Sequence, residues 1–447
     1  MIHLKSQKTD SFWVKTNHDW LLVLLSFLVQ IPIAVFLGHY YDERVFMTTG
    51  YLVSSGLDPY QQYQIVGVFS HPLLQGIIPR FGYPPTGALM LGLTFDLSYQ
   101  VVPNLLFYNF AIKIPVIAAN IFLAFLVRDI MLGLNASKKK AQFAFLFLLF
   151  NPFTLLTTTA WGQFDTVVAL LCVVSLYLLL KGRTGLSAVT LGLSFCVKPI
   201  VLPLLALPFF FGKPKWRDNF KYLSILTATI FTFYILPFLV FGWQLPLAPN
   251  ELNAHFTTAG GMTPFGIVEV INDTLVLPST LKFLGFLWVP ALLLGYYSTY
   301  RNPPSSQTGL IQNAIGLVLI FFLTRSWLSE PNINLLLPLL LIALGTAKVS
   351  FRNFHFAWIM PFFFLFLNYS VPSLFFIPYP TVISDLAVLD AQIRTWRLTG
   401  KLALIALWQV FAWMFLFKML YKKNSKNIIN DKYNIKGIDS ETSQELF

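Results

Sequence analysis

Charged residues are scarce in this chain of 447 residues. Asp, Glu, Lys and Arg together make up 11% of the sequence, whereas soluble domains average about 25%. So few charges cannot cover a surface that faces water on all sides. The composition therefore argues against a soluble enzyme, a disordered chain and a soluble nucleic-acid-binding domain. The apolar share of 56% and the mean hydropathy of +0.66 indicate a membrane protein instead.

Cysteine and acidic residues are scarce as well. Cys172 and Cys196 both lie inside apolar runs, which argues against a disulfide framework and against a cysteine-ligated metal site. The 31 basic residues outnumber the 19 acidic ones and give a net charge of +12. Such an excess suggests either a polyanionic partner or the cytoplasmic loops of a membrane protein, because those loops collect Lys and Arg.

Long apolar runs predict an all-α polytopic membrane protein. A helix needs about 20 apolar residues to cross the hydrocarbon core, and we count about 12 candidate spans, with 11 to 13 as the range. The run 184–212 is interrupted by Lys198, so either one helix kinks there or two short helices meet. A polar stretch precedes the first run and no small-residue cleavage site follows it, so we expect a retained anchor rather than a signal peptide. The predicted spans are 20–38, 106–127, 141–160, 166–180, 184–197, 199–212, 221–241, 281–298, 309–324, 332–347, 354–371 and 398–420.

The basic residues fit one orientation of these spans. With the N-terminus in the cytoplasm, 22 of the 31 basic residues fall in cytoplasmic segments. We therefore expect both termini in the cytoplasm and no nucleic-acid partner. Residues 1–420 are predicted to form one integral-membrane domain, and the polar tail 421–447 is predicted to be a disordered cytoplasmic segment.

The largest outer segment covers residues 39–105. Its second half contains an apolar stretch from Tyr83 to Leu93 that is too short to cross, and we predict an interfacial helix begun by the proline pair 84–85. Most of the acids also fall on the outer side, several beside apolar runs, where an ionised group is costly and so marks a functional candidate. The chemistry is expected to face outward, either outside a prokaryotic plasma membrane or in the lumen of the endoplasmic reticulum.

The first candidate site follows the first span, where Asp42 and Glu43 are adjacent. Two acids at that place could supply a general base or a divalent metal site, but a solvated helix end would carry the same residues. Further along the same outer segment come G-L-D-P-Y, at 56–60, and Y-P-P, at 83–85. An acid after the first span, then G-x-x-P-Y, then Y-P-P, resembles the first outer loop of GT-C glycosyltransferases. More narrowly, the pattern is similar to polyprenyl-phosphate-mannose-dependent mannosyltransferases and the catalytic subunit of GPI mannosyltransferase I.

The resemblance implies transfer of a hexose, mannose in the first place, from a polyprenyl- or dolichyl-phosphate donor to a lipid- or protein-linked glycan acceptor. It makes Asp42, with Glu43 beside it, the catalytic base or a metal-site residue. Many members of these families have D-x-D or E-x-D where this chain has adjacent Asp-Glu, so binding of a Mg²⁺ or Mn²⁺ ion by Asp42 and Glu43 is left open. Tyr60 and Tyr83 are expected to contact substrate.

A second candidate site has the sequence W-G-Q-F-D, at 161–165. Asp165 could simply cap the following helix. The resemblance instead assigns Gln163 and Asp165 to substrate contacts and Trp161 to stacking on a sugar face. Lys198 lies inside an apolar run, where an unpaired cation is costly, so it should meet either a lipid phosphate or an acid such as Asp165.

The remaining candidates are arginines and one acid at the outer side. Arg325 offers a planar fork of donors that suits a phosphate, and the resemblance makes it the contact to the donor phosphate. Glu330 is expected to contact substrate, although an Arg325–Glu330 ion pair that only ties two helices together is the alternative. Arg80 is a further phosphate candidate, or a side chain that snorkels to the membrane surface.

Two other functions compete with this one. A secondary transporter would show paired repeats with broken helices in matching positions, and the break at Lys198 has no evident counterpart. A non-catalytic subunit of a glycosyltransferase complex would make the outer acids dispensable. The partners expected for an enzyme are the lipid-linked donor, the glycan or glycolipid acceptor, the surrounding membrane lipids and a small membrane partner subunit.

Overall fold

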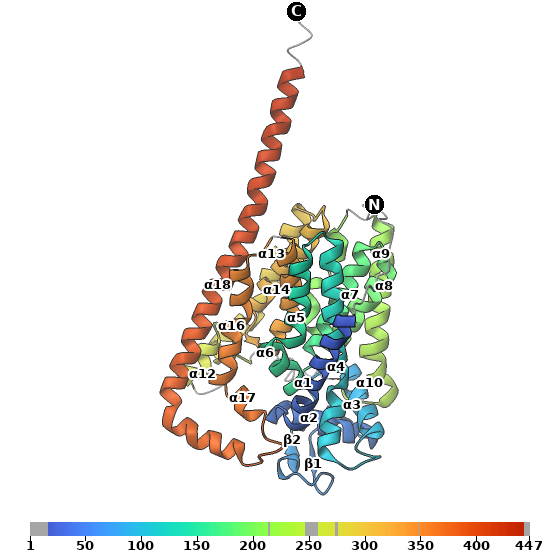
Figure 1. The fold of residues 1–447 in the computed structure, drawn as a ribbon, viewed down its shortest axis with the longest axis vertical. Coiled ribbons are helices and arrows are strands. Elements are labelled where there is room, and N and C mark those ends of the chain that lie inside the picture. Colours follow the sequence, from blue (N-terminus) through green and yellow to red (C-terminus); the bar gives the residue numbers. More distant parts are fainter. Residues whose placement is uncertain (1–16, 213–214, 246–257, 273–275, 347, 442–447) are drawn as a thin grey trace, which may run out of the picture.

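The computed structural model describes residues 17–212, 215–245, 258–272, 276–346 and 348–441. The polar stretch before the first apolar run therefore lies almost entirely outside the described residues. Helices dominate the part of the chain that is described, and the strands form two small two-stranded sheets (Figure 1). The first elements are α1 (Asn17–Phe36), α2 (Tyr40–Ser54), β1 (Tyr63–Ile65), η1 (Pro72–Leu74), β2 (Gly76–Ile78) and α3 (Pro85–Leu97).

The middle of the chain forms most of the bundle. Its first half comprises α4 (Leu105–Gly133), α5 (Lys138–Phe150), α6 (Pro152–Thr154), η2 (Leu155–Ala160), α7 (Asp165–Leu180), α8 (Thr184–Val197), η3 (Pro199–Leu204) and η4 (Leu207–Phe210). Its second half comprises α9 (Trp216–Ile230), η5 (Phe231–Ile235), α10 (Leu236–Phe241), β3 (Gly260–Gly261), α12 (Gly266–Asn272), η6 (Ser279–Phe286), α13 (Trp288–Arg301) and α14 (Gln307–Thr324).

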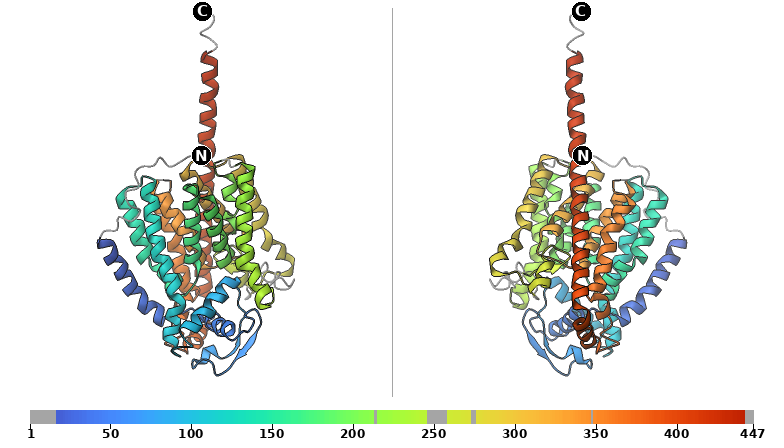
Figure 2. Two further views of the ribbon diagram at one scale, coloured as in Figure 1. Left: turned by 90° about the vertical axis from the view of Figure 1, so that its right-hand side faces the viewer. Right: turned by 90° about the vertical axis from the view of Figure 1, so that its left-hand side faces the viewer.

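The last elements return to the bundle and then leave it. They are β4 (Trp327–Leu328), η7 (Glu330–Asn332), α15 (Ile333–Gly345), α16 (Phe351–Leu367), α17 (Ser370–Ser373) and α18 (Val382–Glu441). The side views in Figure 2 show α18 projecting past the end of the bundle opposite α2 and α3. Helix α18 runs to Glu441 and so extends into the tail 421–447, whose disorder stays a prediction. Residues 442–447 lie outside the described part.

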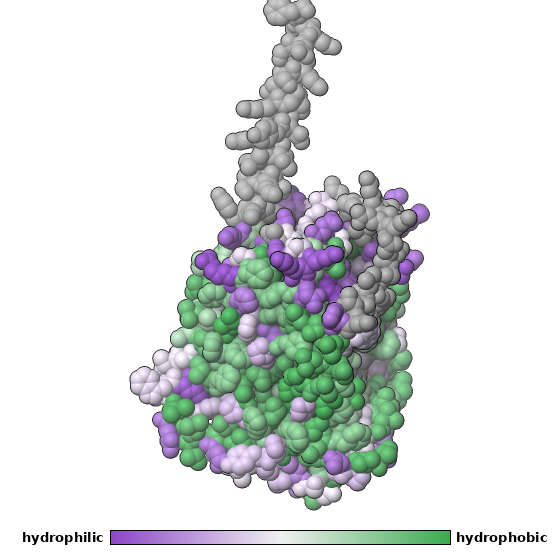
Figure 3. Space-filling view, viewed as in Figure 1, coloured by the Kyte–Doolittle hydropathy of each residue, from purple (hydrophilic) through white to green (hydrophobic). Residues whose placement is uncertain are grey.

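Seven helical segments of the described residues are long and apolar enough to cross a membrane. They are His18–Phe36, Leu105–Gly133, Lys138–Ala160, Trp216–Phe241, Ser279–Arg301, Gln307–Thr324 and Val382–Met419. The other five predicted spans coincide with shorter apolar helices, and the total of twelve stays a prediction. Figure 3 shows a broad hydrophobic band between two more polar ends, as expected of a multi-pass membrane protein.

The break at Lys198 joins two short helices. Helix α8 ends at Val197, Lys198 has an extended backbone with φ −159° and ψ 125°, and η3 then begins at Pro199 as a 3-10 helix. Proline fits the first position of a helix and disfavours a helical conformation in the residue before it. The sequence left a kinked helix and two short helices open, and the structure has two short helices.

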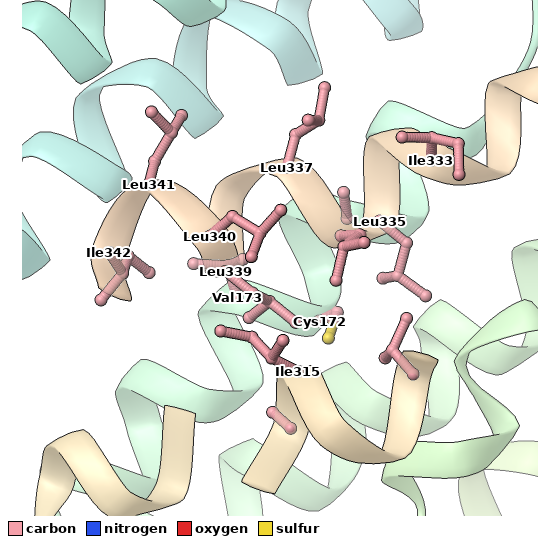
Figure 4. Close-up of a cluster of buried hydrophobic side chains, with 14 of the residues drawn as sticks. Cys172, Val173, Ile315, Ile333, Leu335, Leu337, Leu339, Leu340, Leu341 and Ile342 are labelled. Atoms are coloured by element: carbon pink, nitrogen blue, oxygen red, sulfur yellow. The ribbon is translucent and has the colours of Figure 1, made fainter. Parts of the chain in front are cut away.

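The core of the bundle is built around α15. Every residue of this helix from Ile333 to Gly345 is buried, which is the environment of a helix that is apolar on all sides. Figure 4 shows its leucines and isoleucines packed against Cys172 and Val173 of α7 and Ile315 of α14. Both cysteines are free and buried, as their apolar surroundings predict.

The segment between α1 and α4 forms a cap at one end of the bundle. Helix α2 packs on α3, and the β1–β2 hairpin pairs Tyr63 with Ile78 in antiparallel register (Figure 1). Helix α3 begins at Pro85, as predicted, and its position relative to a membrane surface stays a prediction. Helix α2 was not predicted, because its mixed sequence has no clear apolar period. The cap places the first turn of α2, with both acids, against the bundle.

Candidate active site

A cavity of about 270 Å³ lies between this cap and the bundle. Its walls come from the first turn of α2, the segment before α3, the α8–η3 junction and residues 325–332. Five residues selected from the sequence line it together, namely Asp42, Arg80, Tyr83, Lys198 and Arg325. The fold therefore places one carboxylate and three cations from distant parts of the chain around the same space.

Asp42 is held in one orientation by its neighbours. Its Oδ2 accepts a 2.6 Å hydrogen bond from the indole Nε1–H of Trp161, and its Oδ1 accepts a 3.2 Å hydrogen bond from the hydroxyl of Tyr83. Nδ1 of His39, which directly precedes α2, lies 3.4 Å from the same Oδ2. The side chain stands in the first turn of α2, where a negative charge is favoured by the helix dipole.

These contacts set the protonation of Asp42. Burial by itself would raise the pKa of the carboxyl group, but the His39 side chain, the Trp161 N–H and the charge of Lys198 outweigh burial and leave the pKa below its ordinary value. Asp42 is therefore ionised at neutral pH. It carries a fixed negative charge at the wall of the cavity and has a lone pair with which to accept a proton.

Glu43 has a different environment from its neighbour. Adjacent helix positions point about 100° apart, and Glu43 is fully buried with Oε2 3.8 Å from Nζ of Lys113 on α4. Burial, with a smaller contribution from Asp42, raises the pKa of Glu43 to about 7, and the charge of Lys113 opposes this. Gly162 passes directly over the carboxylate, and a Cβ atom there would lie 2.8 Å from Oε2. Glu43 thus supports the site from behind and does not line the cavity.

Lys198 links the cavity to the 161–165 turn. Its Nζ donates hydrogen bonds to Oδ2 of Asp165 at 2.7 Å and to Oε1 of Gln163 at 3.1 Å. Asp165 is fully buried, and its other oxygen accepts a 2.8 Å hydrogen bond from Asn332. Gln163 also donates to the Tyr83 hydroxyl at 3.0 Å. Of the two partners left open for Lys198, the structure therefore contains the acid, and Lys198 still reaches the cavity wall.

Asp165 does not act as a helix cap here. The N-cap of α7 is Phe164, and both carboxylate oxygens of Asp165 bond to side chains from other elements. Asp165 and Gln163 consequently hold Lys198 and Tyr83 in place. A substrate contact by either residue is a prediction that this geometry does not require.

Arg325 and Glu330 face different partners. The guanidinium of Arg325 stacks over the Phe321 ring at 4.9 Å and lines the cavity. Burial lowers its pKa to about 10, with the charge of Asp165 acting the other way, so Arg325 stays protonated at neutral pH. Glu330 accepts hydrogen bonds from Asn368 at 2.9 Å and Ser370 at 3.2 Å. Arg325 and Glu330 therefore do not form the ion pair that was the alternative prediction.

Two aromatic candidates lie behind the cavity wall. The Trp161 ring stacks on His39 with centroids 3.8 Å apart and is only 4% exposed. This packing favours a role for Trp161 in orienting Asp42 rather than in stacking on a sugar. The hydroxyl of Tyr60 donates a 2.9 Å hydrogen bond to the backbone carbonyl of Tyr83, so Tyr60 holds the Y-P-P segment in position.

The described residues do not fit a metal site shared by Asp42 and Glu43. Among these residues no three His, Cys, Asp or Glu side chains gather as a cation site. Glu43 lies 3.8 Å from Lys113 and does not line the cavity that Asp42 lines. A divalent ion would need at least one of these acids to turn.

Three residues of the site were not selected from the sequence. His39 and Asn332 contact the carboxylates of Asp42 and Asp165, and Lys113 faces Glu43. His39 precedes Asp42 by three positions, a spacing that could have indicated the contact if α2 had been predicted. Lys113 is an ionisable residue inside an apolar run, which is by itself a functional signal.

One comparison with known proteins matches part of the chain to a family. Residues 40–212 match the model of the MptA_B family, described as alpha-(1->6)-mannopyranosyltransferase, N-terminal domain. A comparison with curated proteins gives no significant match. The chain is a glycosyltransferase by this family match, which supports a mannosyltransferase within that class. The matched range contains the cap, the 161–165 turn and Lys198, and ends before Arg325. It also supports the predicted resemblance to GT-C mannosyltransferases in its general form.

Proposed function

We propose that the chain transfers mannose from a polyprenyl- or dolichyl-phosphate donor to a hydroxyl of a glycan or glycolipid acceptor. The family match supports mannosyl transfer in general. The lipid-phosphate donor rests on the cavity itself, where one ionised carboxylate faces Arg80, Lys198 and Arg325. This pairing of a proton acceptor with several cations is the single observation that carries the proposal.

Asp42 acts as the general base in this mechanism. The acceptor hydroxyl loses its proton to Asp42 as its oxygen attacks the anomeric carbon of mannose. The bond from that carbon to the phosphate oxygen breaks at the same time, and both electrons leave with the lipid phosphate. An in-line displacement with one base and one phosphate leaving group inverts the anomeric centre.

The cations stabilise the leaving phosphate. Arg325 is the principal contact, because its planar guanidinium can donate two hydrogen bonds to one phosphate and stays charged near neutral pH. Lys198 and Arg80 add positive charge from other parts of the cavity wall. Such fixed charges, held where negative charge develops, are commonly among the largest contributions to catalysis.

The reaction is proposed to need no divalent ion. The three cations supply the charge that a metal would otherwise supply, and the two adjacent acids point to different surroundings. Transfer should then persist in EDTA. Complete loss in EDTA with recovery on adding Mg²⁺ or Mn²⁺ would show that Asp42 binds a metal.

The cavity is proposed to open on the non-cytoplasmic side, with both termini in the cytoplasm. Basic residues gather at the ends of the spans away from the cap, for example Lys138, Lys139, Lys181 and Arg183. The membrane is then a prokaryotic plasma membrane or that of the endoplasmic reticulum. The narrower resemblance to the catalytic subunit of GPI mannosyltransferase I, with a small partner subunit, belongs to the same proposal.

The decisive experiment gives the purified full-length protein two radiolabelled donors. One is polyprenyl-phosphate mannose and the other is a nucleotide-linked mannose, each with lipids and glycans extracted from the host membrane. We expect label transfer from the lipid donor alone. Transfer from the nucleotide donor alone would contradict the proposal that the donor is a lipid phosphate. Movement of an unmodified solute across vesicle membranes, without any sugar transfer, would favour a transporter. Asp385→Asn, at an exposed acid in the first turn of α18, is the matched control for later Asp42 variants.

A further inference from the structure

A second and larger cavity lies at the opposite end of the bundle. Its volume is about 1070 Å³, and its walls come from α13, α14, α16, α18 and the ends of α5 and α15. Helix α14 connects the two cavities, since Gly309 in its first turn lines the large one and Arg325 after its last turn lines the catalytic one. Gly309 and Arg325 are about 24 Å apart along the helix, and no residue lines both cavities. The large cavity is therefore distinct from the active site.

The charge of this cavity is of one sign. Lys140, Arg301, Lys348 and Lys418 line it, and none of the described residues in its walls is acidic. The last three are exposed, whereas Nζ of Lys140 donates a 3.2 Å hydrogen bond to the carbonyl of Leu344. The cations line one space from α5, α13, α18 and the segment between α15 and α16, so the space attracts an anion.

Two helix starts add to the positive potential. Helices α14 and α16 both begin at the cavity, with Ser306 and Ser350 as their N-caps. The hydroxyl of Ser306 accepts a 3.1 Å hydrogen bond from the backbone N–H of Gly309, and the hydroxyl of Ser350 accepts one of 3.3 Å from Asn353. The other first-turn N–H groups carry the positive end of the helix dipole. These groups supplement the four side chains.

Toward the middle of α13 and α14 the cavity wall includes apolar side chains, beside the polar Gln312 and Asn313. Leu294, Leu317, Ile320 and Phe415 line it from helices that belong to the candidate spans. Gly316 also lines it, and a Cβ atom on Gly316 would meet nothing within 4 Å, so the side of α14 at this glycine faces open space. The cavity thus combines a cationic mouth with an apolar interior.

We propose that this cavity binds an anionic phospholipid of the leaflet opposite the active site. The phosphate lies among Arg301, Lys348 and Lys418, and an acyl chain enters along Gly316. A soluble anion would use the mouth but leave the apolar interior empty. Helix α13, in one wall, is among the least buried candidate spans, with 17% of its apolar window buried, so a membrane lipid has access from the side. Basic pockets between transmembrane helices on the cytoplasmic side are suited to acidic headgroups.

Lipid binding to the full-length protein tests this proposal. The purified protein in a neutral detergent is titrated with phosphatidylglycerol, phosphatidylcholine or inorganic phosphate, and bound lipid is measured by native mass spectrometry. We expect phosphatidylglycerol to bind at least tenfold more tightly than phosphatidylcholine. Equal binding of the two lipids would overturn the proposal. Inorganic phosphate that competes as well as the lipid, mole for mole, would also overturn it, because the site would then recognise a soluble anion.

Variants separate the two parts of the site. The triple change Arg301→Gln, Lys348→Gln and Lys418→Gln removes the exposed cations and should weaken phosphatidylglycerol at least fivefold. Changing Lys138, Lys139 and Arg183 to Gln is the matched control, because these exposed residues do not line the cavity. Equal losses in both triples would show only general surface attraction and would reject the site.

Gly316→Phe tests the apolar interior without removing a charge. The side chain enters open space, so the fold should tolerate it. We expect this variant to lose phosphatidylglycerol binding while its thermal unfolding stays close to that of the wild type. Unchanged lipid binding in Gly316→Phe would place the lipid elsewhere.

Discussion

The two ends of α14 use charge in opposite ways. At the Arg325 end, Asp42, Lys198 and Asp165 are largely buried and each contacts a polar partner. At the Gln307 end, the cations are mostly exposed and line a cavity whose described walls contain no acid. Buried charges in a medium of low dielectric need partners and interact strongly. Exposed cations are available to whatever anion the membrane surface supplies. The first arrangement suits a reaction and the second suits binding.

The largest expected effect comes from Asp42→Asn, which removes the proposed general base from the cavity at the Arg325 end of α14. The amide keeps the shape of the side chain and can still accept the Trp161 hydrogen bond, but it cannot take a proton. We expect the single-turnover transfer rate to fall by about 10²–10⁴. Asp385→Asn should leave the rate unchanged. An Asp42→Asn rate within twofold of wild type would remove Asp42 from the chemistry.

Arg325→Gln comes next and removes one cation from the wall. Charged hydrogen bonds contribute roughly 1.5–3 kcal/mol, so kcat/KM for the donor should fall by about 10- to 100-fold. The loss should appear in donor affinity and in the rate at saturating donor, with the acceptor KM unchanged. Arg394→Gln, on α18 beside Asp390, is the matched control. A larger loss for the acceptor than for the donor would give Arg325 a different role.

Lys198→Met tests how far the buried pair supports the fold. It leaves the fully buried Asp165 without its 2.7 Å partner, and breaking such a pair typically costs about 3–5 kcal/mol. We expect a clear fall in the thermal unfolding temperature in detergent. The double variant Lys198→Met, Asp165→Asn should recover part of it. Lys139→Met, at an exposed position of the opposite end, should have little effect, and equal losses in both lysine variants would contradict the comparison.

Glu43→Gln tests whether the buried acid at this end makes the stability of the protein depend on pH. The folded-state pKa of Glu43 is raised to about 7, so folding is favoured most below its ordinary pKa of 4.5, and this stability is lost as the pH rises toward 7. Wild-type thermal stability should therefore decrease between pH 5 and pH 8. The decrease should be smaller in Glu43→Gln, measured by thermal unfolding at each pH. The same slope in both proteins would mean that Glu43 does not titrate in this range.

Tyr60→Phe should have the smallest effect. It removes the hydrogen bond from the Tyr60 hydroxyl to the backbone carbonyl of Tyr83, which corresponds to about 1 kcal/mol. Thermal unfolding should shift slightly and the transfer rate should change little. A loss of activity as large as that of Arg325→Gln would instead make Tyr60 a direct substrate contact.

The sequence predicts the helices of this fold better than its cap. Apolar runs mark the bundle helices directly, and the proline at 85 marks the start of α3. Helix α2 was not predicted because its sequence mixes polar, acidic and aromatic residues. It is stabilised by packing on α3 rather than by an apolar period in its own sequence. Without α2, the different surroundings of Asp42 and Glu43 could not be foreseen.

Apart from the Lys198–Asp165 pair, which was one of two alternatives, the candidate site was predicted by residue type and not by contact. Asp42, Lys198 and Arg325 stand out because ionisable groups are rare beside apolar runs. The orientation of Trp161 toward Asp42, and of Asn332 toward Asp165, depends on how distant segments pack. Such side-chain pairs leave no signal in the spacing of a single sequence.

Donor binding and single-turnover transfer, measured side by side in Asp42→Asn and Arg325→Gln, test the central claim most directly. The account assigns proton removal to Asp42 and phosphate recognition to Arg325. Asp42→Asn should bind polyprenyl-phosphate mannose with wild-type affinity and transfer at a rate reduced by at least about 10². Arg325→Gln should bind the donor more weakly and keep more of the rate at saturating donor. Loss of donor binding in Asp42→Asn with an unaffected rate at saturation would contradict the account.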